Sequence, residues 1–291
     1  MNILSLDHAI SDKERAELLF QGEVLIYRNI KAMQALISYS DTLLRKHLDG
    51  ADPVSAQQHF APDVFLERMG KAQTIFRQSK EPKDLFFAVL EACGMDLAQA
   101  FYDHFPMRVV PYGETHNGAH RAAIGHHRDT WGSNIHSQMN WWAPIYALES
   151  ERTIAIYPVY WDQSIANNTA TWRFENYLQA RKQVSPERKS SYPSAPRPTQ
   201  AVDESCLVKL LMNPGDVLNF SSAHLHASVP NTTQAARFSV EMRTIHQDDI
   251  IFGREAPNVD NAGKEPMHQW FKSIIDKRTS LESVLNRSNE G

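Results

Sequence analysis

The sequence predicts a mainly β fold with flanking helices. From about residue 107 to 248, short segments alternate apolar and polar residues and are separated by polar turns, which is the pattern of half-buried strands. Before residue 107 the apolar residues recur at helical spacing. About eight strands in one region are typical of a jelly roll, in which two sheets face each other. We therefore expect one domain, 1–291, with a helical buttress (1–106), a double-stranded β-helix or cupin-like core (107–248, interrupted at 164–205) and a C-terminal helix (264–285).

The helical part begins after a short β start. Two extended segments, 3–6 and 23–28, flank a short helix whose capping signal is Ser11-Asp12-Lys13-Glu14. Further helices are expected at 31–49, 63–78, 82–93, 95–104 and, inside the insertion, 171–182. The expected core strands are 107–112, 121–127, 136–146, 152–158, 206–212, 216–220, 223–228 and 236–246.

Composition excludes several kinds of partner. The formal net charge is −4 and the chain has no basic run, so a nucleic acid is not expected as a partner. There is neither a signal-peptide-like start nor an apolar window of roughly 20 residues, which predicts a cytoplasmic protein without a membrane partner. Cys93 and Cys206 have apolar neighbours and are expected to be reduced and buried. The oligomeric state is open.

A metal site is indicated by three histidine and aspartate positions in a fixed order. On an extended segment residues i and i+2 face the same way, so His127 and Asp129 can reach one ion. His226, which follows a Pro214-Gly215-Asp216 turn and a strand, adds a third ligand. Two histidines and one carboxylate with open positions are typical of non-haem Fe(II) oxygenases.

Each histidine ligand has a neighbouring alternative. His126 precedes His127, but only His127 has the i, i+2 relation to Asp129. His224 is two residues before His226 and is expected on the same strand face. The context Ser228-x-Pro230-Asn231 favours His226 as the ligand, which leaves His224 as a residue near the substrate.

The motif at 214–239, PGDVLNFSSAHLHASVPNTTQAARFS, resembles the C-terminal motif of Fe(II)/2-oxoglutarate-dependent oxygenases, in particular the phytanoyl-CoA dioxygenase-like branch. His127-Arg128-Asp129 resembles the His-x-Asp of that family, and 141–158 resembles the strand pair between the two motifs. The resemblance covers about residues 107–246. This chain departs from the pattern at Glu151-Arg152-Thr153, where a glycine is usual, and in the length of its insertion.

The resemblance implies a dioxygenase that binds Fe(II) through His127, Asp129 and His226 and uses 2-oxoglutarate and O2. Such an oxidoreductase hydroxylates or otherwise oxidises a C–H bond of a small metabolite and releases succinate and CO2. Related halogenases replace the carboxylate ligand with a small residue, so Asp129 favours a hydroxylase. No catalytic residue is expected beyond the metal ligands.

Two kinds of side chain are expected to bind 2-oxoglutarate. Arg237 suits the 5-carboxylate, because a guanidinium binds a carboxylate through two parallel hydrogen bonds, and Ser239 faces the same way. Arg243 on the same strand face is the alternative anchor. Asn140, which alternates with Gln138, is expected to donate to an oxygen of the cosubstrate.

The substrate side is less defined by sequence. Trp131 and Tyr160 adjoin the motif loops and are expected to line the pocket together with His224. The insertion 164–205 is expected to form a lid, whose deletion over 184–200 would uncouple succinate formation from product formation.

Two other functions stay open. One is a cupin-type metal dioxygenase or isomerase that does not use 2-oxoglutarate, and it would need no arginine at position 237. The other is a non-catalytic jelly-roll binding protein, which has no reason to place His, Asp and His in this order.

Overall fold

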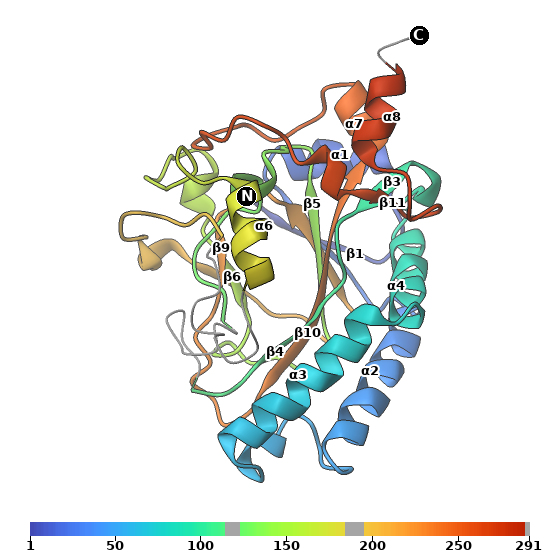
Figure 1. Cartoon of the computed structure of the whole chain (residues 1–291), viewed down its shortest axis with the longest axis vertical. Helices are drawn as coiled ribbons and strands as arrows, with labels where there is room; N and C mark the ends of the chain where they lie inside the picture. Colours follow the sequence, from blue (N-terminus) through green and yellow to red (C-terminus); the bar gives the residue numbers. More distant parts are fainter. Residues whose placement is uncertain (114–122, 184–194, 289–291) are drawn as a thin grey trace.

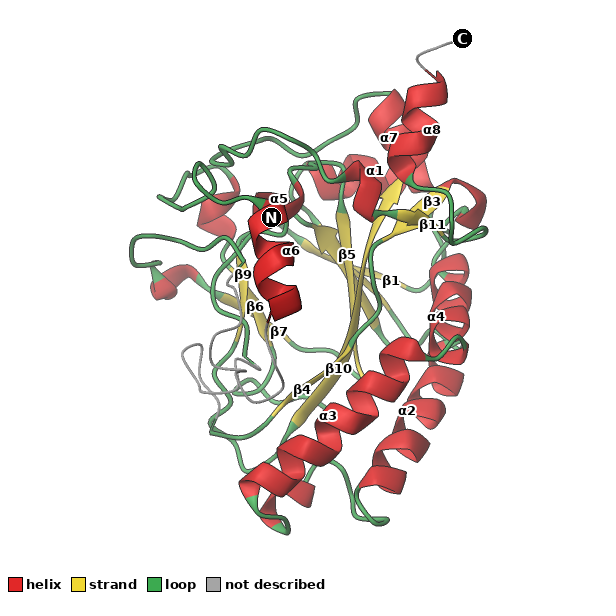
Figure 2. Ribbon diagram, in the orientation of Figure 1, coloured by secondary structure: helices red, strands yellow, loops and turns green. Residues whose placement is uncertain are grey.

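The computed structural model describes residues 1–113, 123–183 and 195–288, and it combines one large sheet, one small sheet and helices (Figures 1 and 2). The large sheet is antiparallel apart from the pairing of its first two strands. Its order is β1 (Ile3–Leu6), β2 (Val24–Tyr27), β8 (Val217–Ser221), β5 (Met139–Pro144), β10 (Arg237–His246), β3 (Ala100–Tyr102) and β11 (Lys272–Ser273). β4 (Met107–Val110) pairs with the first half of β10.

The small sheet lies opposite the large one. It consists of β7 (Val208–Leu210), β6 (Ile154–Ile156) and β9 (His226–Ser228), in that order. The segment that carries His127 lies beside β9, because His127 and His226 form a β-bridge. Apolar side chains from both sheets pack together between them: Val24, Ile26, Trp142, Ile154, Ile156, Leu210, Met212, Leu218 and Phe220.

Helices cover the outer face of the large sheet. They are α1 (Asp12–Phe20), α2 (Met33–His47), α3 (Pro62–Gln78) and α4 (Glu81–Ala92). Figure 1 shows α2, α3 and α4 side by side along the edge of the molecule. Their buried residues share one core cluster with Trp141, Phe238 and Val240 of the sheet, so the helical part and the strands stabilise each other. Ser11 caps α1 as predicted, accepting from the Glu14 N–H at 3.2 Å.

The remaining elements are short or belong to the connections. They are η1 (Ala56–Gln58), α5 (Thr130–Ser133), η3 (Pro158–Trp161), α6 (Phe174–Gln183), η5 (Glu204–Cys206) and α7 (Gln247–Ile251). In the described part of the chain, no helix combines the length and the apolar character needed to cross a membrane. Both cysteines are free thiols; Cys93 is buried, but Cys206 is partly exposed, contrary to the prediction.

Three predicted elements differ in the structure. The helix expected at 95–104 is wrong: after a single turn, η2 (Leu97–Gln99), the chain enters β3 and pairs with β10. The helix expected at 264–285 is also wrong over most of its length, which contains η6 (His268–Trp270) and β11 before α8 (Leu281–Ser288). In both places the pairing of strands overrides local helical spacing. Of the predicted strand 121–127, residues 121 and 122 lie outside the described residues, and the rest is extended only at the His127 bridge.

The alternation of β10 positions the site. Its apolar residues Phe238, Val240 and Met242 pack under the helices. The polar residues between them therefore face the small sheet: Arg237, Ser239, Glu241 and Arg243. A row of ionic and hydroxyl groups thus runs along the space between the two sheets.

Candidate metal centre

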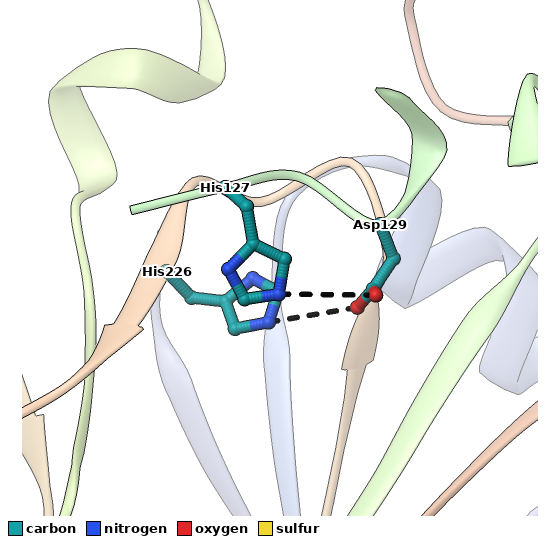
Figure 3. A group of neighbouring side chains, drawn as sticks. All are labelled: His127, Asp129 and His226. Carbon is teal, nitrogen blue, oxygen red and sulfur yellow. Dashed lines mark ion pairs between the residues drawn. The ribbon is translucent and has the colours of Figure 1, made fainter. Parts of the chain in front are cut away.

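His127, Asp129 and His226 converge between the two sheets, as Figure 3 shows. One ligand atom from each lies within 4.8 Å of the other two. Nε2 of His127 is 3.8 Å from Oδ1 of Asp129, and Nε2 of His226 is 3.5 Å from Oδ2. Divalent first-row metals take nitrogen and oxygen ligands at about 2.0–2.2 Å, so one ion fits among these atoms after small side-chain shifts.

Both imidazoles are oriented through their second nitrogen. Nδ1 of His127 donates to the Gly125 carbonyl at 2.8 Å, and Nδ1 of His226 donates to the His224 carbonyl at 3.0 Å. This tautomer leaves the Nε2 lone pair of each ring free for a metal. Burial, together with the neighbouring His226, lowers the pKa of His127 to about 4, so the ring is neutral at neutral pH.

Asp129 is held from two sides. Asn140 Nδ2 donates to Oδ2 at 2.5 Å, and Arg243 Nη1 donates to Oδ1 at 2.9 Å. Burial by itself would raise the pKa of Asp129, but Arg243 and the two imidazoles hold it below its usual range. The carboxylate is therefore ionised, as a metal ligand must be.

Asn140 lies beside the candidate ligand Asp129. Its amide NH2 donates to Asp129, and its carbonyl oxygen accepts from Ser222 Oγ at 2.7 Å. Ser222 in turn accepts from Gln138 Nε2 at 2.8 Å. This buried chain fixes the amide toward the carboxylate and orients it, while the contact of Asn140 with the cosubstrate stays a prediction.

Arg237 lies deeper in the same interior, 1% exposed. It donates to the Thr153 carbonyl at 2.5 Å and to Ser228 Oγ at 3.2 Å, and its guanidinium lies 5.9 Å from the ring centroid of Trp142. Within residues 1–113, 123–183 and 195–288, its Nε has no hydrogen-bond partner, nor does the hydroxyl of Ser239. Burial, with the charge of Arg108, lowers the pKa of Arg237 to about 9.

Arg108 and Arg243, the other two arginines in the space between the sheets, are paired with carboxylates. Arg108 pairs with Glu241, and Arg243 with both Asp103 and Asp129. Across the described ranges, no carboxylate lies within ion-pair distance of Arg237. Arg243, the alternative anchor, is thus engaged, while Arg237 keeps an unsatisfied donor. Asp103 was not foreseen, because nothing in its local sequence distinguishes it from a surface aspartate.

The three residues expected at the substrate pocket belong to packed regions. Trp131 is 2% exposed, and its Nε1 donates to Asp260 Oδ1 at 2.6 Å. Tyr160 packs in the same apolar cluster outside the small sheet. His224 lies in the turn before β9, not on the strand, and its ring packs against Trp161 at 4.4 Å between centroids. All three contribute to core packing, and a role for them at a substrate pocket stays a prediction.

The Asp260 carboxylate holds the segment that contains His127 and Asp129 through hydrogen bonds to its neighbours. Its Oδ2 accepts from Arg128 Nη2 at 3.0 Å and from the Ile165 N–H at 3.1 Å, while Oδ1 accepts from Trp131. Arg128, which lies between the two ligands His127 and Asp129, also donates to the carbonyls of Ala223, Tyr160 and Gln163. These buried contacts join the metal motif to the start of the insertion and to the C-terminal segment.

We expect Asp260→Asn to lower the free energy of unfolding by about 3 kcal/mol, because it leaves the buried Arg128 guanidinium without its counter-charge. Chemical denaturation measures this. Asp49→Asn is the matched control, since Asp49 pairs with Arg68 at 2.7 Å but is 70% exposed, and its effect should be small. Equal effects of the two substitutions would contradict a structural role for the Asp260 cluster.

The described parts of the insertion lie against the small sheet and the C-terminal segment. Val202 packs on the outer cluster of the small sheet, Tyr157 donates to Glu204 at 2.7 Å, and Asn167 Nδ2 donates to the Asp260 carbonyl at 2.9 Å. Phe174 at the start of α6 contacts Trp270. The predicted lid includes residues 184–194, which lie outside the described residues, so it stays a prediction.

Comparison with known proteins finds solved structures of low similarity. No protein-family model matches the chain, and no curated protein matches it. EvdO2 from Micromonospora carbonacea var. aurantiaca aligns with a TM-score of 0.45 at 12% identity, over 84% of this chain and 94% of that one. The non-heme alpha ketoglutarate dependent carbocyclase SnoK from nogalamycin biosynthesis gives 0.41 at 13%, over 89% and 95%. The non-heme monooxygenase ThoJ gives 0.41 at 12%, over 80% and 76%.

Proposed function

We propose that this protein is a non-haem Fe(II)/2-oxoglutarate-dependent oxygenase that oxidises a C–H bond of a small metabolite. The observation that carries the proposal is the pairing of two groups in one interior. His127, Asp129 and His226 offer three ligand atoms to a metal. Arg237 offers a buried guanidinium that has no carboxylate partner in the part of the chain that the structure describes. A divalent metal and an acidic cosubstrate would satisfy both.

The strand order supports a jelly-roll core. The large sheet contains the order β4–β10–β5–β8, and the small sheet continues from the His127 segment through β9 and β6 to β7. From β4 to β10, successive segments alternate between these two sheets, except that β6 and β7 pair within the small sheet, and this arrangement fits a double-sheet jelly roll. Placement in the phytanoyl-CoA dioxygenase-like branch rests on the motif at 214–239, and a cytoplasmic location on the composition.

The donor set fits Fe(II). Two neutral imidazoles and one carboxylate leave a bound ion three further positions, and O2 and a chelating 2-oxo acid need all three. Fe(II) with 2-oxoglutarate and O2 would supply the oxidising power for C–H oxidation, with release of succinate and CO2. The protein contributes fixed ligand tautomers, an oriented carboxylate and a site enclosed between the sheets.

Charge balance favours joint binding of metal and cosubstrate. Among the described residues, three carboxylates and three guanidiniums lie in this interior. The carboxylates are Asp103, Asp129 and Glu241, and the guanidiniums are Arg108, Arg237 and Arg243. A divalent cation together with a dianion preserves that balance, whereas either one alone leaves a net charge in a buried space. Arg237 and the Ser239 hydroxyl would bind the far carboxylate of 2-oxoglutarate.

Succinate release tests this function without a known substrate. The purified protein, loaded with Fe(II) under air, should convert 2-oxoglutarate slowly to succinate, and a metal chelator should stop the reaction. Calorimetry with Mn(II) in place of Fe(II) should show 2-oxoglutarate binding only to the metal-loaded protein. Metal binding without 2-oxoglutarate binding would instead favour the cupin-type enzyme. Absence of metal binding would favour a binding protein.

A further inference from the structure

The guanidinium of Arg243 is shared between two carboxylates. Its Nη1 donates to Oδ1 of the candidate ligand Asp129 at 2.9 Å. Its Nε donates to Oδ2 of Asp103 at 2.6 Å, and Nη2 also contacts that oxygen. A guanidinium often binds a single carboxylate through two parallel hydrogen bonds, but that of Arg243 bridges two carboxylates.

Asp103 keeps Arg243 in this position. The Asp103 side chain is completely buried, and its backbone N–H donates to the Arg243 carbonyl at 3.4 Å. The His104 N–H donates to its Oδ1 at 2.6 Å. The His104 ring also contacts Asp103, with Nδ1 2.7 Å from Oδ2, but Arg243 is its permanently charged partner. Moving the guanidinium away would take that counter-charge from a buried carboxylate, which is costly.

The two oxygens of Asp129 are therefore not equivalent. Oδ1 accepts from a cation, whereas Oδ2 accepts from the neutral amide of Asn140. Both hydrogen bonds end on an ionised carboxylate, but only the one to Oδ1 brings a full positive charge beside its oxygen, which makes the electrostatic potential at Oδ1 less negative than at Oδ2. Oδ2 is the better donor to a metal, and it also lies closer to its imidazole partner, 3.5 Å from Nε2 of His226.

We propose that Arg243, held by Asp103, is a positioning residue that reserves Oδ1 of Asp129 and leaves Oδ2 as the only carboxylate oxygen for a divalent metal. The inference rests on the proposed function for the identity of the site. A carboxylate that binds through both oxygens would take a fourth position and leave two, too few for a chelating cosubstrate and O2 together. Arg243 would thus preserve the third open position.

The double variant Asp103→Asn/Arg243→Gln tests this, because it removes the bridge together with one buried charge of each sign, and a bound divalent ion would still neutralise Asp129. With Mn(II) bound, we expect water-proton relaxation from metal-bound water to fall by about one third, since one of three open positions is lost. Affinity for Mn(II) should stay within about threefold of wild type, while 2-oxoglutarate affinity of the Mn(II) form should fall at least about tenfold.

The matched control is Asp249→Asn/Arg254→Gln. That pair is also close, at 2.7 Å, and similarly buried, with Asp249 fully buried and Arg254 23% exposed, but it does not contact Asp129. The control should leave all three quantities unchanged. If the double variant does not fold, Arg243→Lys replaces it. The compact ammonium lacks the planar, fixed arrangement of donors that spans both carboxylates, so the same direction of change is expected.

Two results would overturn the inference. One is unchanged water relaxation and unchanged 2-oxoglutarate affinity after loss of the bridge. The other is a parallel loss of Mn(II) and 2-oxoglutarate affinity, which would show that Arg243 only supports the fold of the site. Water relaxation is measured without 2-oxoglutarate, so failure of wild type to bind that cosubstrate would refute the proposed function and not this inference.

Discussion

Asp129→Ala and His226→Ala should each abolish succinate formation and weaken divalent metal binding by more than about a hundredfold, since loss of an outer contact alone costs 10- to 100-fold. Each substitution removes one of the three ligand atoms that the structure brings together. The His226 ring packs edge-on against Phe220 at 5.1 Å between centroids, but neither ligand is a member of the apolar cluster between the sheets. The fold should persist, and thermal unfolding together with Mn(II) calorimetry measures both effects.

His8→Ala provides the control for loss of an imidazole. The His8 side chain is 65% exposed and contacts only Asp7 among the described ion pairs. Metal affinity and succinate formation should be those of the wild type. If Asp129→Ala and His226→Ala both retain wild-type activity, the assignment of the metal ligands is wrong.

The second large effect is expected on the affinity for 2-oxoglutarate. Arg237→Ala should lower the apparent affinity for 2-oxoglutarate at least about tenfold, because removing one partner of a buried charge pair costs roughly 2–5 kcal/mol. Arg237→Lys should recover only part of the loss. An ammonium retains the charge but cannot reproduce the two parallel hydrogen bonds of a guanidinium. The dependence of succinate formation on 2-oxoglutarate concentration gives these values.

Arg45→Ala is the matched arginine control. Arg45 pairs with Asp41 at 2.8 Å on the surface of α2, with 43% of its side chain exposed, and should leave 2-oxoglutarate affinity unchanged. Unchanged 2-oxoglutarate dependence in Arg237→Ala would contradict its role as anchor. The other inward guanidiniums, Arg108 and Arg243, would then be the residues to test.

Local sequence patterns predicted many of the helices and strands. The alternation in 236–246 predicted β10, and helical spacing predicted α2, α3 and α4 to within about two residues, the usual uncertainty of helix ends. Spacing also indicated the metal motif, because an i, i+2 relation acts over a few ångströms. The helix predicted at 95–104 failed because Ala100–Tyr102 gains hydrogen bonds to β10, a strand far away in the sequence.

Tertiary structure alone decided which face of β10 is functional. The sequence determined that Arg237, Ser239, Glu241 and Arg243 share one face, but an alternating strand can turn its polar side toward solvent or toward an enclosed site. Helices α1 to α4 cover the apolar side, so the polar side faces the small sheet and the metal centre.

The same distinction explains the residues around the ligands. The sequence determined the type and order of His127, Asp129 and His226, since short-range spacing and a strand turn are local properties. Only the tertiary structure joined Arg243 to Asp103, which is 140 residues away, and placed Trp131 and Tyr160 in a packed cluster. Such contacts depend on strand register and on packing between sheets, and neither is encoded within a short stretch of chain.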